Sequence, residues 1–356
     1  ASFFGVTTAW VVTRYEFPGR LVFEWMLLLP AAIPAYIVAY TYTDFFEYAG
    51  PVQSQLRMMF GWARPSDYWF PEIRSLGGAI LVMASVLYPY IYMVTRIAFR
   101  LTPASLFEIA LVHRKSQFRD VGLPLARPAI AAGLALVLME VVSDFGTVEY
   151  FAVETLTLGI FNVWLGMNNI VAAAQISLVG FVFILSLLGL ELYARSRQRF
   201  SSTTSKTNKL QPLMLRGRGQ ALCVVICCLP LVFGFFIPVG VLLKFVLTGQ
   251  AGANLVAVAG VVTGSVSVAI LAALLVMVIS TLIVLAATYR GGEMLRRMAM
   301  LASTGYAVPG TMLAIGVLIF AGAIDRIYAG LVGDSRASLL LGGLGILLVA
   351  YLVRFQ

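Results

Sequence analysis

Long apolar runs separated by short polar stretches dominate this chain. Each complete run is close to the ~20 residues that a helix needs to cross a bilayer core of about 30 Å. The runs are continuous and do not alternate between polar and apolar residues, so they are typical of helices and not of barrel strands. The pattern predicts an all-α, polytopic transmembrane helical bundle with spans at 1–12 (partial), 21–42, 76–99, 128–148, 170–193, 221–247, 262–287, 298–323 and 339–353.

Composition and charge support a membrane protein. Of the 356 residues, 60% are apolar and only 12% are charged, which excludes both an ordinary soluble domain and a disordered chain. If the spans alternate, the loops on one side, which include 96–127 and 195–218, carry 19 of the 25 Lys and Arg residues. Positive charge collects in cytoplasmic loops, so we place those loops in the cytoplasm. The basic excess then reflects orientation in a lipid bilayer, and we expect no nucleic-acid partner.

The polar, basic segment 195–218 divides the chain near its middle. Thr13 aligns with Thr288 and Pro34 with Pro309, both at an offset of 275 residues, and each proline interrupts an apolar run. Both threonines fall on the cytoplasmic side, so the order predicts two parallel repeats, a plan known in transporters. We therefore expect a first transmembrane half at 1–194, a cytoplasmic linker at 195–218 and a second half at 219–356.

Residues suited to catalysis or to binding a metal are scarce. The three cysteines lie in one apolar run without a C-x-x-C spacing, and His113 is the only histidine. None of the four lysines follows a G-x-x-x-x-G run, so the chain lacks a phosphate-binding loop of that kind. We expect no enzyme activity, no fixed metal site and no cofactor in this chain.

The segment 100–130 contains the most distinctive loop. Thr102-Pro103 can start a helix, Glu108 stands alone among apolar residues, and Leu123-Pro124 leads into the next span. The segment therefore predicts a short helix, a break, a second short helix and a turn. A short amphipathic helix in the cytoplasm is suited to docking a soluble partner.

This loop resembles the EAA loop of type I ABC importer permeases, the MetI-like family. Glu108 and Ala110 match the start of that motif, and Leu123 and Pro124 match its end. The chain is most similar to the permeases of bacterial ferric-iron importers, which have two fused homologous halves. The stretches that carry this narrower resemblance are 27–44, 138–167, 302–319 and 351–355.

The resemblance implies a multi-pass permease subunit in the bacterial inner membrane. Its partners would be an ATPase of the ATP-binding cassette type, contacted through the four motif residues, and a periplasmic binding protein that delivers ferric iron. In the family each half has such a loop, and the second should begin about a dozen residues beyond Arg354, where the sequence has ended. We therefore expect a piece of a longer protein, shortened in both halves.

Four residues are candidates for a translocation pathway. Glu140 and Asp144 are spaced i and i+4, on one face of the predicted fourth span, and carboxylates suit a hard cation such as Fe³⁺. Pro34 and Pro309 break spans and can expose backbone groups to a cavity. As alternatives, Asp144 lies at the membrane interface, Glu140 pairs with a neighbouring helix, and the prolines are packing kinks. We interpret Glu24, four residues after Arg20, as a structural ion-pair partner.

Two alternative functions stay open at the level of the sequence. The same architecture could carry another small solute, such as an anion or a polyamine. An ion-coupled secondary transporter is a different class, in which uptake would collapse with an uncoupler and continue without ATP.

Overall fold

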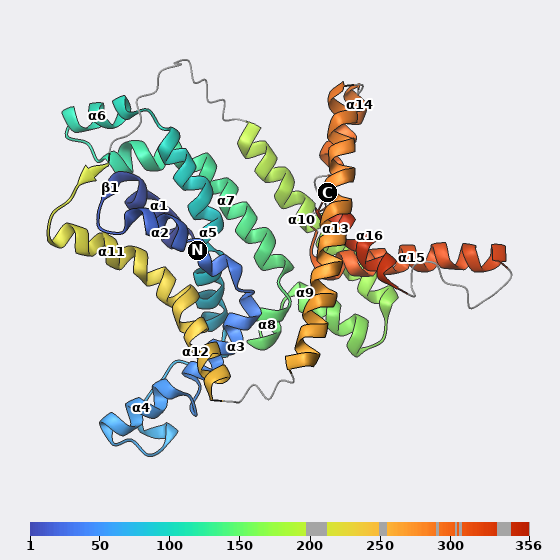
Figure 1. The fold of residues 1–356 in the computed structure, drawn as a ribbon, viewed down its shortest axis with the longest axis horizontal. Coiled ribbons are helices and arrows are strands. Elements are labelled where there is room, and N and C mark those ends of the chain that lie inside the picture. Colours follow the sequence, from blue (N-terminus) through green and yellow to red (C-terminus); the bar gives the residue numbers. More distant parts are fainter. Residues whose placement is uncertain are drawn as a thin grey trace. The chain divides into compact units, whose positions relative to one another are not determined.

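The computed structural model describes residues 1–196, 212–248, 255–289, 292–302, 305, 308–332 and 343–355 (Figure 1). In these residues the chain is almost entirely helical. Five helices are long and apolar enough to cross a membrane, and a sixth span forms if two bent helices are counted together. This confirms the predicted all-α, polytopic class. The described residues form two compact units, 1–154 with 187–250 and 155–186 with 251–356.

Three helices form the centre of the first unit: α1 (Ser2–Arg14), α5 (Leu76–Leu101) and α7 (Leu123–Ser143). α1 and α7 both pack against α5, where glycines allow a close approach. A Cβ atom at Gly5 would lie 2.8 Å from Cβ of Ile91, and one at Gly133 would lie 2.8 Å from its Cα. Small residues at such contacts are common where helices associate in a membrane.

The predicted second span is broken, as its prolines indicate. It consists of α2 (Arg20–Met26), the short 3₁₀ helix η1 (Leu29–Ala32) and α3 (Ala35–Phe46). The segments Arg20–Ala32 and Ala35–Phe60 are bent by 89° relative to each other. Pro34 lies at the N-cap of α3 and keeps the preceding Ile33 extended, since a residue before proline is disfavoured in the helical region.

A hairpin that we predicted on the periplasmic side follows α3. It contains α4 (Pro51–Phe60) and the 3₁₀ turn η2 (Pro65–Asp67), and its rings Phe60, Trp62 and Tyr68 stack with centroids 4.8 and 4.7 Å apart. Asp67 Oδ2 accepts hydrogen bonds from the backbone N–H groups of Arg64 and Ala63, which lower the pKa of Asp67. The hairpin is therefore ordered by its own contacts.

The first unit also includes residues that we assigned to the second half. α11 (Arg218–Leu231), the π-helical turn η5 (Val232–Phe236) and α12 (Ile237–Leu247) contact α1, α5 and α3 respectively. A π turn leaves a carbonyl without its usual helical partner, and here Tyr42 Oη donates to the carbonyl of Phe233 at 2.6 Å. The compact units therefore do not follow the expected boundary at 219.

A two-residue parallel ladder extends this attachment. β1 (Tyr15–Glu16) pairs with β2 (Leu213–Met214). The end of the predicted linker thus pairs with the turn that follows α1. Most of that linker, 197–211, lies outside the described residues.

The second unit consists of helices from 155–186 and from 251–356. They are α9 (Leu156–Phe161), the π turn η4 (Asn162–Gly166), the first part of α10 (Ile170–Ser196), α13 (Leu255–Tyr289), α14 (Glu293–Ala302), α15 (Gly310–Val332) and α16 (Leu344–Phe355). The eighth span predicted at 298–323 is broken, as Pro309 indicated, because α14 ends at Ala302 and α15 begins directly after Pro309. Proline without its N–H and with a fixed φ separates the two helices.

The order of elements agrees with the expected repeat. α13 ends 275 residues after α1 ends, and α15 begins 275 residues after α3 begins. In both places a short helix, α2 or α14, lies between the two, and a proline directly precedes the second helix. The offset of 275 residues, first seen for two residue pairs, therefore also relates the ends and starts of whole helices.

Candidate functional site

The expected docking helix is present as α6 (Ala104–Val112). It starts just after α5, with Pro103 at its N-cap and the hydroxyl of Thr102 bonded to the carbonyl of Ala98 at 2.9 Å. Phe107 and Ala110 are buried, and Phe107 is only 1% exposed. The opposite side of the helix is open, and it presents Leu106, Glu108, Ile109, Leu111 and Val112.

Trp10 of α1 packs against the buried side of α6 and against the loop that follows it. Its ring lies 5.9 Å from Phe107 and 5.1 Å from Phe118 between centroids, and it also meets Phe99 edge to face at 5.2 Å. Gly122 passes so close that an added Cβ would lie 2.7 Å from the Trp10 ring. We did not expect this role for Trp10, because an aromatic residue inside an apolar run gives no sign of what it contacts.

A polar bridge reinforces the same attachment. Arg14, at the end of α1, donates from Nε and Nη2 to Oε1 of Gln117 at 2.9 and 2.8 Å. The Gln117 amide in turn donates to the carbonyl of Phe107 at 3.0 Å. α1 thereby holds both short segments of the loop in a fixed orientation.

The second segment of the loop is the π helix η3 (Gln117–Gly122), and it continues directly into α7. Leu123 and Pro124 are therefore the first two residues of α7, where proline is tolerated, and not a turn. The predicted start of this span at 128 was too late, because Pro128 lies inside the helix.

Between α6 and the start of α7 lies an open groove of about 560 Å³. The groove is lined by Leu106, Ile109, Ala110, His113, Lys115, Asp120, Val121, Pro124 and Leu125. Of the four predicted motif residues, Ala110 and Pro124 line it and Leu123 is adjacent in sequence. Glu108 is exposed on α6 and forms no hydrogen bond or ion pair with the described residues.

A second polar cluster lies at the same end of α5. Glu24, with a side chain 8% exposed, receives hydrogen bonds from Arg96 and from Arg100 at 2.6 Å, and Arg20 Nη2 lies 3.5 Å away. The expected Arg20–Glu24 pair is thus confirmed as one part of a larger network. Arg96 and Arg100 were missed, because they lie over 70 residues further along the chain.

The expected carboxylate pair has a different geometry. Glu140 is half-buried in the last turn of α7, but the helix ends at Ser143, so Asp144 is not on its face. Asp144 instead accepts hydrogen bonds from the backbone N–H and hydroxyl of Thr147, at 2.8 and 3.0 Å, in α8 (Gly146–Tyr150). Burial raises the pKa of Asp144, and the bonds from Thr147 partly offset this.

The remaining pathway candidates, Pro34 and Pro309, both lie where a predicted membrane span is interrupted. Pro34 is the N-cap of α3, and Pro309 directly precedes α15. They belong to different compact units. Within the described part of the chain, no three His, Cys, Asp or Glu side chains gather as a metal ion would require.

Residues 1–202 match the model of the family described as binding-protein-dependent transport system inner membrane component. The matched region is more than half of the chain and includes α6, its groove and the Glu24 cluster. The chain belongs to this permease family. Membership, together with several helices able to span a membrane, identifies a multi-pass inner-membrane protein.

Relatives of this chain are named for different solutes. The sulfate transport system permease protein CysT of Salmonella typhimurium is 27% identical over 157 residues, which are 42% of this chain and 52% of that protein. The Fe(3+)-transport system permease protein FbpB 2 of Haemophilus influenzae is 26% identical over 198 residues, 54% of this chain and 34% of that protein. The sulfate transport system permease protein CysW of Escherichia coli is 28% identical over 160 residues, 41% and 48% of the two chains.

These alignments cover about half of each curated relative or less. No solved structure matches the chain.

Proposed function

We propose that this chain is the membrane-spanning permease part of an ATP-driven importer that receives its solute from a binding protein. The family description supports the class of transporter. The observation that carries the proposal is the geometry of α6, whose apolar residues Ile109, Leu111 and Val112 are exposed while Phe107 anchors it. A soluble ATPase subunit would cover that face.

The ATPase is proposed to act through α6 on the membrane helices. α6 is joined to α5 by only two residues, and its underside is fixed to α1 by Trp10 and by the Arg14–Gln117 bridge. A displacement of α6 would therefore be transmitted to α1 and α5, the centre of the first unit. Glu108 would supply a polar contact to the ATPase beside the apolar face.

For the solute, we propose ferric iron. The resemblance of 27–44 and 138–167 to ferric-iron permeases and the likeness to FbpB 2 support it. The sulfate permeases CysT and CysW favour a second candidate, a small oxyanion.

Uptake measurements test the proposal and separate the two solutes. The full-length protein, with the ATPase and binding protein of its own operon, is expressed in cells that lack their own iron and sulfate importers. We expect ATP-dependent accumulation of ⁵⁵Fe³⁺ and not of ³⁵S-sulfate. Accumulation of sulfate alone would assign the oxyanion as the solute. Uptake that is abolished by an uncoupler but unaffected by ATP depletion would identify a secondary transporter and contradict the proposed ATP-driven importer.

A further inference from the structure

The cluster around Glu24 leaves one arginine facing outward. Arg20 is already committed, since its Nε donates to the carbonyl of Val12 at 2.8 Å and Nη1 to Glu16 at 2.6 Å. Arg100 is different, because its side chain is 47% exposed and, among the residues that the structure describes, only its Nη2 is bonded, to Glu24. A guanidinium has five N–H donors in a fixed plane, so Arg100 is oriented by Glu24 and retains donors that point away from it.

Arg96 adds a second unfilled donor. Its Nη2 bonds to Glu24 and its guanidinium lies 5.8 Å from the ring of Tyr92, but its buried Nε has no hydrogen-bond partner in the described residues. Buried polar groups without partners are uncommon. The cluster has three arginines against two carboxylates, Glu16 and Glu24, so it keeps an excess positive charge.

The exposed side chains of α5 near Arg100 are apolar, as is typical of a helix that faces lipid. Met93, Ile97 and Leu101 are exposed on α5 at a spacing of four residues, and Arg100 lies at the end of this stripe. α5 then ends and the chain turns into the cytoplasmic helix α6. Arg100 therefore lies where the apolar surface gives way to the polar loop, which is the level of the lipid headgroups.

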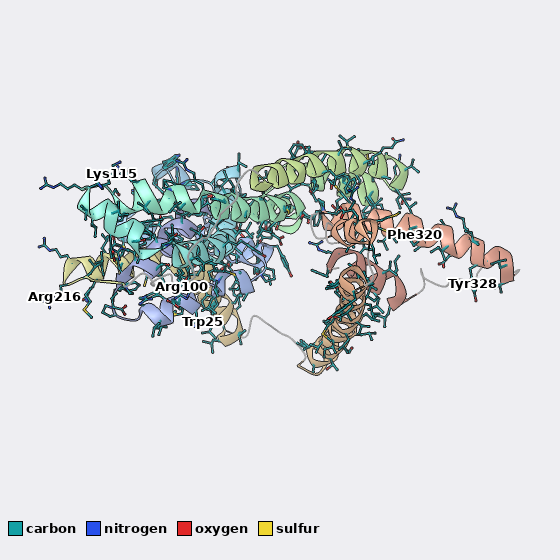
Figure 2. All side chains as sticks on the ribbon, turned by 90° about the horizontal axis from the view of Figure 1, so that it is seen from above. Trp25, Arg100, Lys115, Arg216, Phe320 and Tyr328 are labelled. Atoms are coloured by element: carbon teal, nitrogen blue, oxygen red, sulfur yellow. The ribbon has the colours of Figure 1, made fainter. Side chains whose placement is uncertain are left out.

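α2 completes the surroundings. Glu24 faces the arginines, whereas Leu21, Val22 and Trp25 are exposed, Trp25 by 75%. Trp25 directly follows Glu24 in α2, the residue that holds Arg100, and Figure 2 labels both Trp25 and Arg100. Tryptophan is enriched at membrane interfaces, and a basic pocket between helices on the cytoplasmic side is typical of binding sites for anionic lipid headgroups.

We propose that Arg100, positioned by Glu24, binds the phosphate of an anionic phospholipid in the cytoplasmic leaflet, with the exposed Trp25 of α2 at the same membrane interface. The free donors of Arg100 contact the phosphate, and the lipid chains lie along Met93 and Ile97. The site concerns the bilayer and is independent of the solute and of the docking of the ATPase.

The test uses the full-length protein in nanodiscs of phosphatidylcholine that contain an equal share of either brominated phosphatidylglycerol or brominated phosphatidylcholine. Bromine quenches nearby tryptophan fluorescence, and subtraction of the Trp25→Phe signal isolates Trp25 from the other tryptophans. We expect at least twofold stronger quenching of Trp25 by the brominated phosphatidylglycerol. Arg100→Gln should abolish this preference and Arg100→Lys should retain part of it.

Arg119→Gln is the matched control, because Arg119 is an exposed arginine of the same cytoplasmic loop, outside the cluster. It removes the same charge and should leave the preference intact. Equal quenching by the two lipids in the wild-type protein would overturn the proposal, as would equal loss of preference in Arg119→Gln. Loss of the preference on addition of millimolar inorganic phosphate would assign the site to a soluble anion and would also overturn it.

Discussion

At the scale of single residues, Glu24 is the charged side chain whose loss we expect to reduce stability most. It is nearly buried and balances Arg96 and Arg100 on another helix. Removing one partner from a buried ion pair leaves an uncompensated charge and costs about 3–5 kcal/mol. Because Arg100 is half-exposed, we expect Glu24→Gln to destabilise the protein by about 3 kcal/mol, measured by thermal unfolding in detergent.

Glu16→Gln provides the control for that experiment. Glu16 also pairs with Arg20 but is 43% exposed, and exposed ion pairs contribute about 0–1 kcal/mol. An equal loss of stability in the two variants would show that Glu24 has no special position.

Gly122 leads to a second prediction at this scale. Trp10 occupies the space that a side chain would need, and overpacking of this kind costs about 1–3 kcal/mol. Gly122→Ala should therefore lower the unfolding temperature and loosen α6, measured by faster amide exchange in 104–112. Gly240→Ala in α12, where no atom lies within 4 Å of the added Cβ, should be neutral, and a similar loss there would indicate a general effect of replacing glycine.

At the scale of elements, α6 can be tested as a docking helix. Glu108→Ala and Ile109→Asp change only its exposed side, so insertion and folding should be unaffected. We expect at least a threefold loss of ATPase binding for Ile109→Asp and a smaller loss for Glu108→Ala, measured by co-purification from membranes. Glu72→Ala, an exposed residue outside α6 and its loop, is the control. Unchanged binding in both α6 variants would exclude α6 as the contact.

The elements also show how far the sequence could predict the fold. Apolar run lengths located most of the membrane-spanning helices, and Pro34 and Pro309 marked real breaks, because both signals act locally along the chain. The end of α7 was placed too late, since a period of 3.6 residues cannot show that Asp144 bonds to Thr147 and starts a new helix.

The candidate site, like the fold, was predictable only where local sequence signals define it. The motif located α6, but the sequence gave no indication of the contacts of Trp10 or of Arg96 and Arg100 beside Glu24. Those contacts join residues far apart in sequence, and a single sequence contains no periodic signal for such pairs.

At the scale of the whole molecule, the charge distribution predicts the orientation. Ser116 and Ser66 are exposed in loops on opposite sides of the membrane in this interpretation. With the native cysteines replaced, Ser66→Cys should react with an impermeant maleimide in intact cells, and Ser116→Cys should react only after the membrane is permeabilised. Labelling of residue 116 in intact cells would reverse the orientation, and with it the cytoplasmic position of α6.

The pairing of β1 with β2 has a consequence for how the polypeptide could be divided. Residues 212–247 include the end of the predicted linker and the helices that follow it. They contact the amino-terminal helices through this ladder, through the packing of α11 against α1 and through the Tyr42–Phe233 hydrogen bond. A protease site inserted within 197–211 should therefore yield two fragments that stay together without a covalent link. After cleavage, we expect an affinity tag on the amino-terminal fragment to retain the carboxy-terminal one in mild detergent, and the Tyr42→Phe variant to retain less of it.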